Sequence, residues 1–252
     1  MKMQAHRGVC TECPENTMPA FQRALDQGYP IIELDPKFTA DDICVVLHDD
    51  TINRTCRALD GSAFAEKISI ETLTFAQSQE LDAGLWFGEE FKGTKIPLLK
   101  DVLAFAKAHS IHIKIDNVFV HFPEHQQQIL FDIVEASGAD AGFTCPNIAT
   151  IQKVVSRFPK AAIHYDGYVD EETVIKVKEC LKENHLIVWL PFDNKITSWC
   201  TMPKATPERC AMVKQYAELG VWILHEEEDR ALAKTLGADI IETTGSLKPD
   251  GQ

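Results

Sequence analysis

The sequence lacks any apolar run that approaches the length of a transmembrane helix. It also lacks an excess of positive charge, because 25 Lys and Arg residues stand against 38 Asp and Glu residues, for a net charge of −13. Proteins that bind nucleic acids or dock on anionic lipids need a basic surface. We therefore expect neither partner. The totals do not exclude a small anionic substrate, and they leave the oligomeric state open.

The chain shows no secretory signal, because no apolar segment precedes the polar residues that begin at His6. Its eight cysteines are scattered, and several lie in apolar runs (Cys44, Cys180, Cys210). No second pair accompanies Cys10–Cys13 to complete a zinc site, so we interpret that pair as two loop cysteines. Buried thiols are typical of a reducing compartment, which predicts a cytoplasmic protein.

Short β-rich runs alternate with amphipathic helical patterns along the 252 residues. This alternation predicts parallel strands joined by right-handed crossovers, and the length is usual for an α/β barrel of eight strands. The strand candidates are 3–7, 30–35, 43–49, 110–116, 141–145, 161–166, 186–192, 220–224 and 238–243. The predicted helices are 16–28, 98–109, 147–158, 171–183, 207–219 and 228–236. There is one strand candidate too many for a barrel, so we expect the one at 186–192 to be irregular or peripheral.

The segment 55–97 breaks the alternation, with several glycines, aromatic residues and many polar ones. We interpret it as a small insertion over the C-terminal mouth of the barrel. The chain contains no linker, internal repeat or low-complexity stretch, so residues 1–252 are expected to form a single domain.

Two acidic residues follow each other on one face of the strand at 30–35. Glu33 and Asp35 alternate with Ile32 and Leu34, so the aliphatic pair can pack on helices while both acids point into the barrel. Two confined carboxylates repel each other unless a proton or cation lies between them, and oxygen ligands suit Mg²⁺ or Ca²⁺. A salt bridge to a lysine on a neighbouring strand would explain the pair equally well.

Two histidines also end predicted strands, His6 at the first and His48 near the end of the third. Active sites of α/β barrels lie at the C-terminal strand ends, so a histidine pair beside two acids favours general acid and base catalysis. Arg7 can form a fork of two hydrogen bonds to a phosphate.

On the strand at 110–116, His112, Lys114 and Asp116 share the inward face. A lysine buried in a barrel needs an anion beside it. A bound phosphate would supply one, and so would Glu33 or Asp35.

Several sequence motifs, taken together, resemble those of the glycerophosphodiester phosphodiesterase family. They are AHRG, PENT, AFQRAL, IELD and VVLHDDTINRT in about the first sixty residues, and GVWILHEEED and LGADIIETTGSLKP near the end. The resemblance implies a TIM barrel and one divalent cation, Mg²⁺ or Ca²⁺. It also implies hydrolysis of small-molecule glycerophosphodiesters, such as glycerophosphocholine, to glycerol 3-phosphate and an alcohol.

The resemblance also assigns roles. By it, His6 and His48 match the catalytic histidine pair, Arg7 matches the phosphate-binding arginine, and Glu33 and Asp35 match metal ligands.

Two further matches are less specific. Glu15, in the PENT match, is expected to anchor the loop or the site. Trp222 matches an aromatic residue that lines the substrate cavity, although a place in the core explains it almost as well.

The fourth strand departs from the family pattern, which usually has Glu-x-Lys where this chain has IHIKIDN. In one register His112 replaces the glutamate and Lys114 is kept; in the other, Lys114 takes the glutamate position and Asp116 the lysine position. Because Mg²⁺ and Ca²⁺ prefer carboxylate oxygen to imidazole nitrogen, we expect Asp116 as the third metal ligand and Lys114 on the phosphate. The departure leaves two alternatives open: a phospholipase D-like lyase that forms cyclic phosphates, and a barrel that binds phosphodiesters without catalysis.

Overall fold

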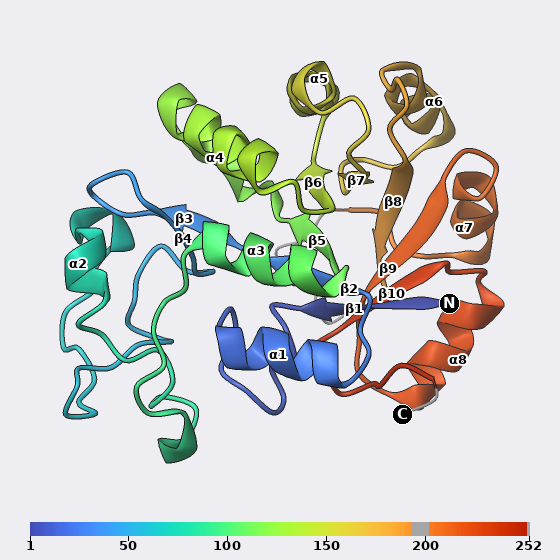
Figure 1. Ribbon diagram of the computed structural model, residues 1–252. Coiled ribbons are helices and arrows are strands. Elements are labelled where there is room, and N and C mark those ends of the chain that lie inside the picture. Colours follow the sequence, from blue (N-terminus) through green and yellow to red (C-terminus); the bar gives the residue numbers. More distant parts are fainter. Residues whose placement is uncertain (193–201, 251–252) are drawn as a thin grey trace.

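A computed structural model describes residues 1–192 and 202–250, and it shows a closed barrel of parallel strands (Figure 1). Going round the barrel, the strands follow the order β1-β10-β9-β8-β7-β6-β5-β2. Their bounds are Lys2–His6 (β1), Ile31–Leu34 (β2), His112–Ile115 (β5), Ala141–Cys145 (β6), Ile163–Tyr165 (β7), Leu186–Pro191 (β8), Glu218–Leu224 (β9) and Ile240–Thr243 (β10). The predicted TIM barrel is confirmed.

Helices cover the outside of the barrel and bury their apolar faces against it. They are α1 (Met18–Asp26), α3 (Leu99–His109), α4 (Glu124–Ser137), α5 (Ile148–Arg157), α6 (Glu171–Glu179), α7 (Pro207–Val213) and α8 (Glu227–Thr235). A proline in the first turn begins α1, and the side chain of Asn147 caps α5 by accepting a hydrogen bond from the backbone N–H of Thr150.

One helix was missed, and one was predicted too long. The sequence pattern did not reveal α4, and the helix predicted over 207–219 ends at Val213, because Glu218 already begins β9. None of the helices in the part of the chain described here is both long enough and apolar enough to cross a bilayer.

The prediction that the strand at 186–192 would be irregular was wrong, because β8 pairs with both β7 and β9 inside the barrel. The sequence of β8 is a continuous apolar run because a strand in a parallel barrel is buried on both faces. The predicted strand that lies outside the barrel is the one at 43–49, which forms β4 (Cys44–Val46) and pairs antiparallel with β3 (Pro36–Phe38). The connection over 39–43 is far too short for a parallel crossover, so the chain forms a hairpin there.

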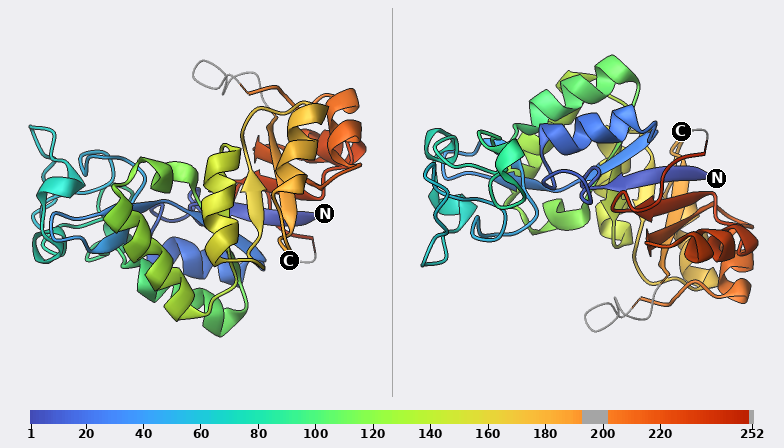
Figure 2. Two further views of the ribbon diagram at one scale, coloured as in Figure 1. Left: turned by 90° about the horizontal axis from the view of Figure 1, so that it is seen from above. Right: turned by 90° about the horizontal axis from the view of Figure 1, so that it is seen from below.

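The segment after β4 packs around an apolar cluster of its own. This insertion core consists of Val45, Leu47, Ile52, Cys56, Ile70, Ala83 and Ile96. The segment carries η1 (Ile70–Thr72), α2 (Phe75–Ser78) and η2 (Glu89–Phe91), while the short η3 (Asn117–His121) follows β5. Both views of Figure 2 place the segment, in cyan and teal, at the end of the molecule opposite α7 and α8.

Strand register brings three inward-facing residues to one level of the barrel. His6 on β1 is the Cα partner of Glu33 on β2, and Glu33 is the partner of Lys114 on β5. Leu34 lies on the other face of β2, in the core under the helices. The alternation predicted for β2 is confirmed, and it aims an imidazole, a carboxylate and an ammonium group into the barrel.

Candidate active site

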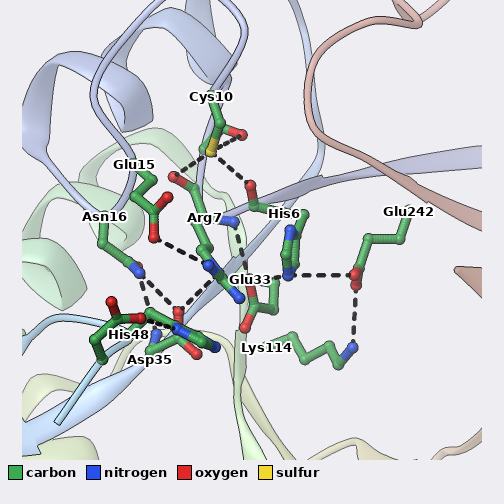
Figure 3. A network of polar contacts seen from close by, with 12 residues as sticks. His6, Arg7, Cys10, Glu15, Asn16, Glu33, Asp35, His48, Lys114 and Glu242 are labelled. Atoms are coloured by element: carbon green, nitrogen blue, oxygen red, sulfur yellow. Dashed lines mark hydrogen bonds and ion pairs between the residues drawn. The ribbon is translucent and has the colours of Figure 1, made fainter. Parts of the chain in front are cut away.

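A cavity of about 640 Å³ opens at the C-terminal ends of the barrel strands. All eight residues that the sequence predicted for the site line it: His6, Arg7, Glu33, Asp35, His48, Lys114, Asp116 and Trp222. Six further residues line the same cavity without having been assigned to it: Asp166, Trp189, Met202, Ile223, His225 and Glu242. Figure 3 shows the polar contacts in one part of this cavity.

Three carboxylates gather on one wall of the cavity. Glu33 is on β2, Asp35 directly follows it, and Asp116 follows β5. Each offers an oxygen atom, and these atoms all lie within 4.8 Å of one another. Burial, together with the charges of Asp35 and Asp116, raises the pKa of Glu33 well above its ordinary value. The group is therefore strongly stabilised by any positive charge placed between its oxygens.

The loop between β1 and α1 orients these carboxylates. The side-chain amide of Asn16 donates to Asp35 Oδ2 at 2.7 Å, and the backbone N–H of Arg7 donates to Glu33 Oε2 at 3.0 Å (Figure 3). Asn16 has a φ of 55°, in the left-handed region, which asparagine tolerates better than most residues. The sequence pattern indicates Asn16 or Thr17 as the cap of the first helix, and it does not indicate this contact of Asn16 with Asp35.

Arg7 is surrounded by acidic groups. Its Nη1 donates to Glu15 Oε1 at 3.0 Å, and its Nε lies 3.3 Å from Asp35 Oδ2. Burial alone would lower the pKa of Arg7, but Asp35, Glu33 and Glu15 raise it, so the guanidinium stays charged. Glu15 also accepts two hydrogen bonds of 2.7 Å from Arg54, the residue directly before the insertion. Glu15 thus anchors the loop, as expected, and Arg54 is an addition that the sequence did not indicate.

The turn that carries Arg7 requires a glycine directly after it. Gly8 has a φ of +84°, and a Cβ at this position would lie 2.7 Å from the Cβ of Ala20 on α1. Only glycine lets the turn follow this path and pack directly against the helix.

His6 is held between two carboxylates at the floor of the cavity. Its Nε2 lies 3.9 Å from Glu33 Oε2 and 3.9 Å from Glu242 Oε1. Burial lowers the pKa of His6 to about 4, although the charge of Glu242 partly opposes the shift. The imidazole is therefore neutral near pH 7, and one of its ring nitrogens carries no hydrogen.

His48 reaches the cavity from the hairpin rather than from a barrel strand, because β4 ends at Val46. Its Nδ1 lies 2.7 Å from Asp49 Oδ1, so this nitrogen carries a hydrogen and Nε2 is left for proton exchange. Arg54 donates to Asp49 at 2.8 Å and, as the main cause, lowers the pKa of Asp49 to about 2. Arg54 and Asp49 together orient the imidazole.

Lys114 is paired with the carboxylate of Glu242, which was not predicted as a site residue from the sequence. Its Nζ donates to Glu242 Oε2 at 3.1 Å and lies 4.1 Å from the centroid of the Trp189 ring. Glu242 lies on β10, near the C-terminal end of the strand predicted over 238–243. The rule that selected Glu33 and Asp35, an acid near the end of a predicted barrel strand, would have found it.

Comparison with known proteins bears on this arrangement. The model of the glycerophosphoryl diester phosphodiesterase family matches residues 6–165, well over half of the chain. The chain belongs to this family.

Curated members of the family align with about half of the chain. A glycerophosphodiester phosphodiesterase from Caldanaerobacter subterraneus is 37% identical over 133 residues, which are 52% of this chain and 51% of the relative. One from Bacillus altitudinis is 34% identical over 131 residues, 51% of this chain and 50% of the relative. The chain thus matches about half the length of these curated relatives.

Solved structures share the fold over nearly the whole chain. A phosphodiesterase from Oleispira antarctica, solved in complex with the product sn-glycerol-3-phosphate, superposes with a TM-score of 0.76 at 17% identity, over 98% of this chain and 94% of that one. A glycerophosphoryl diester phosphodiesterase from Parabacteroides distasonis gives a TM-score of 0.72 at 19% identity, over 96% and 82%. At this level of identity, the likeness shows the barrel fold alone.

Strand β5 separates the two candidates for a third ligand. Asp116 joins Glu33 and Asp35 at the cavity. His112 begins β5 at the other end of the strand, where its Nδ1 lies 3.1 Å from Asp140 and its Nε2 lies 3.1 Å from His164 Nε2. Asp116 is therefore favoured over His112 on two grounds: the chemical preference of the cation for a carboxylate and the position of the residue along the strand.

The first cysteine of the Cys10–Cys13 pair lies beside the site. Cys10 and Cys13 are free thiols. Cys10 donates to the backbone oxygen of His6 at 3.0 Å, and burial raises the pKa of its thiol well above the ordinary value. A thiol in this state is a poor nucleophile and a poor metal ligand.

Proposed function

We propose that this protein hydrolyses glycerophosphodiesters to glycerol 3-phosphate and an alcohol, with the help of one divalent cation, Mg²⁺ or Ca²⁺. The observation that supports this most strongly is the convergence of Arg7, the two histidines and three carboxylates on one cavity. Membership of the family supports the same reaction.

Glu33, Asp35 and Asp116 would hold the cation. Three closely spaced carboxylate oxygens are the donor set that Mg²⁺ and Ca²⁺ prefer, and the raised pKa of Glu33 indicates a group that needs positive charge. A bound cation would neutralise charge on the phosphate oxygens and make phosphorus more electrophilic.

Arg7 and Lys114 bind the phosphoryl oxygens in this proposal. The planar guanidinium of Arg7 can donate two parallel hydrogen bonds, whereas Lys114 adds a point charge. Trp222, on β9, lines the opposite side of the cavity and contacts the organic part of the substrate.

His6 and His48 transfer the protons. One imidazole takes the proton of the attacking oxygen as this oxygen forms its bond to phosphorus, and the other protonates the alcohol oxygen as its bond to phosphorus breaks. Attack by water gives glycerol 3-phosphate directly. Attack by the neighbouring glycerol hydroxyl gives a cyclic phosphate, which water then opens by the same two transfers.

We further propose that the chain works as a single domain in the cytoplasm on a small-molecule substrate, without nucleic acid. The net charge of −13 supports the exclusion of nucleic acid. The buried free thiols Cys44, Cys56 and Cys145 support a reducing compartment.

The test is turnover of glycerophosphocholine by metal-stripped protein, followed by ³¹P NMR before and after addition of Mg²⁺ or Ca²⁺. Glycerol 3-phosphate should accumulate only with the cation, and Asp35→Asn should abolish turnover. Asp132→Asn, an exposed change on α4 of the same chemical kind, serves as the control and should leave turnover intact.

Two results would overturn the proposal. A cyclic phosphate as the final product would identify a lyase, and binding of glycerophosphocholine without turnover would identify a barrel that only binds phosphodiesters. Full activity of metal-stripped protein would exclude the cation from the reaction.

A further inference from the structure

Glu242 is a buried carboxylate that the proposed reaction does not use. It is 3% exposed, and β10, which carries it, closes the barrel against β1. Its Oε2 accepts from Lys114 Nζ at 3.1 Å and also from the side-chain amide of Gln4, while its Oε1 faces His6 (Figure 3). Burial opposes ionisation of Glu242, but Lys114 lowers its pKa, so the carboxylate is charged.

Lys114 has acidic groups on two sides. Glu242 is its direct partner, while Glu33 is its Cα neighbour across the β2–β5 pair and Asp116 lies two residues further along the chain. Glu242, then Glu33, then Asp116 raise the pKa of Lys114 against the effect of burial. A buried ammonium must have a counter-charge, and the flexible lysine stem allows it to reach more than one.

We propose that Glu242 is a positioning residue: it holds Lys114 on the β10 side of the barrel and thereby keeps the ammonium off the carboxylates that bind the cation. This inference rests on the proposed cation site of Glu33, Asp35 and Asp116. Without the charge of Glu242, the acidic groups that still act on the ammonium are Glu33, Asp116 and Asp166, and the first two of these are proposed ligands of the cation. The ammonium gains a counter-charge there by turning toward Glu33 or Asp116. It then competes with a divalent cation for the same oxygens.

Gln4 and Trp189 support the assignment. The Gln4 amide donates to the same Glu242 oxygen that binds Lys114, and this second hydrogen bond helps to hold that oxygen in place. The Trp189 ring lies under the ammonium on the β8 side and offers a second favourable contact there. Both groups stabilise Lys114 in the position away from the cation site.

The test is a double-mutant cycle on metal-stripped protein, with Ca²⁺ or Mg²⁺ affinity measured by titration calorimetry. Glu242→Gln should weaken binding by about 10–100-fold, the range seen when a group that orients metal ligands is lost. In a Lys114→Met background the same change should alter affinity by no more than about twofold, the usual error of additivity. Glu218→Gln, at the opposite end of the barrel beside Lys2 and His185, is the matched control and should leave affinity unchanged.

The cycle separates positioning from a direct effect of charge. If Glu242→Gln weakens binding equally with Lys114 and with Met at that position, its charge acts on the cation itself and the proposal is overturned. If Glu242→Gln does not fold, Glu242→Asp keeps the charge but shortens its reach. Glu242→Asp should weaken cation binding less than Glu242→Gln would, and this effect should also vanish in the Lys114→Met background. A loss of affinity that persists in that background would overturn the proposal.

The same measurements distinguish this inference from the proposed function. Normal affinity in Glu242→Gln, with binding abolished by Asp35→Asn, would overturn the positioning role alone. Wild-type protein that binds no divalent cation would overturn the cation site and this inference together.

Discussion

The two imidazoles of the cavity differ in their surroundings, although the proposed reaction uses both to transfer protons. The side chain of His6 is 18% exposed and lies between carboxylates, whereas that of His48 is 40% exposed beside Asp49. Replacing either residue with Ala should lower kcat by about 10²–10⁴-fold, because a proton-transfer group is lost. Thermal melts should show an intact fold, and His109→Ala on α3 is the control. A near-normal rate for His48→Ala would mean that another group performs its transfer.

Asn16 would act on the proposed cation site through Asp35. The amide fixes one carboxylate oxygen by its 2.7 Å hydrogen bond, so Asn16→Ala should leave all three ligands present but less well oriented. We expect cation affinity to fall by about 10–100-fold, the usual consequence of losing a group that orients a ligand. Calorimetry on the stripped protein measures this. Unchanged affinity would show that Asp35 is oriented by Arg7 alone.

At the scale of elements, the strands β5, β7 and β8 share a buried hydrogen-bonded chain below the cavity. Trp189 Nε1 donates to His164 Nδ1 at 3.1 Å. Because an indole N–H can only donate, His164 must carry its hydrogen on Nε2, which faces His112 Nε2 at 3.1 Å. His164 is therefore neutral, and burial lowers its pKa well below the ordinary value.

This arrangement predicts that the protein loses stability in acid. Below about pH 6.5 the unfolded chain protonates this histidine while the folded chain does not, so the free energy of unfolding decreases as pH falls. Between pH 7.5 and 5.5, the contribution of one such group is about 1.4 kcal/mol. In urea unfolding at pH 7.5, His164→Gln should have a lower free energy of unfolding than the wild-type protein. From pH 7.5 to 5.5, however, the free energy of unfolding of the variant should fall by about 1.4 kcal/mol less than that of the wild-type protein. An identical loss in both proteins would exclude His164 as a cause.

The hairpin β3–β4 decides where His48 lies. Had β4 entered the barrel as a parallel strand, His48 would occupy a strand tip like His6. The short connection forbids this, and the antiparallel pairing instead carries His48 to the cavity from the side of the insertion. One member of the histidine pair thus depends on an element outside the barrel.

For the whole molecule, the insertion is a second packing unit that is tied to the barrel near the site. Ile70 is fully buried in the insertion core, and Arg54, the residue directly before the insertion, binds Glu15. Ile70→Ala should reduce stability by about 2–5 kcal/mol, since it leaves a cavity in a packed cluster. Because that cluster is separate from the barrel core, hydrogen exchange should increase more over residues 50–97 than in β5–β8. Equal increases in both regions would show that the two cores unfold together.

Local patterns in the sequence were enough to predict much of the site. Alternation along a strand places Glu33 and Asp35 on the inner face, and the strand-end rule for barrels selects His6; both depend on short-range geometry that the chain carries within a few residues. The contacts that depend on closure of the barrel were decided only by the tertiary structure. Closure of the barrel brings Glu242 close to Gln4 and Lys114, which are far from it in the sequence. The height of each residue along the barrel axis places Asp116, and not His112, with the other carboxylates. These outcomes escape local reasoning because register between distant strands is set by the packing of the whole barrel, not by any segment alone.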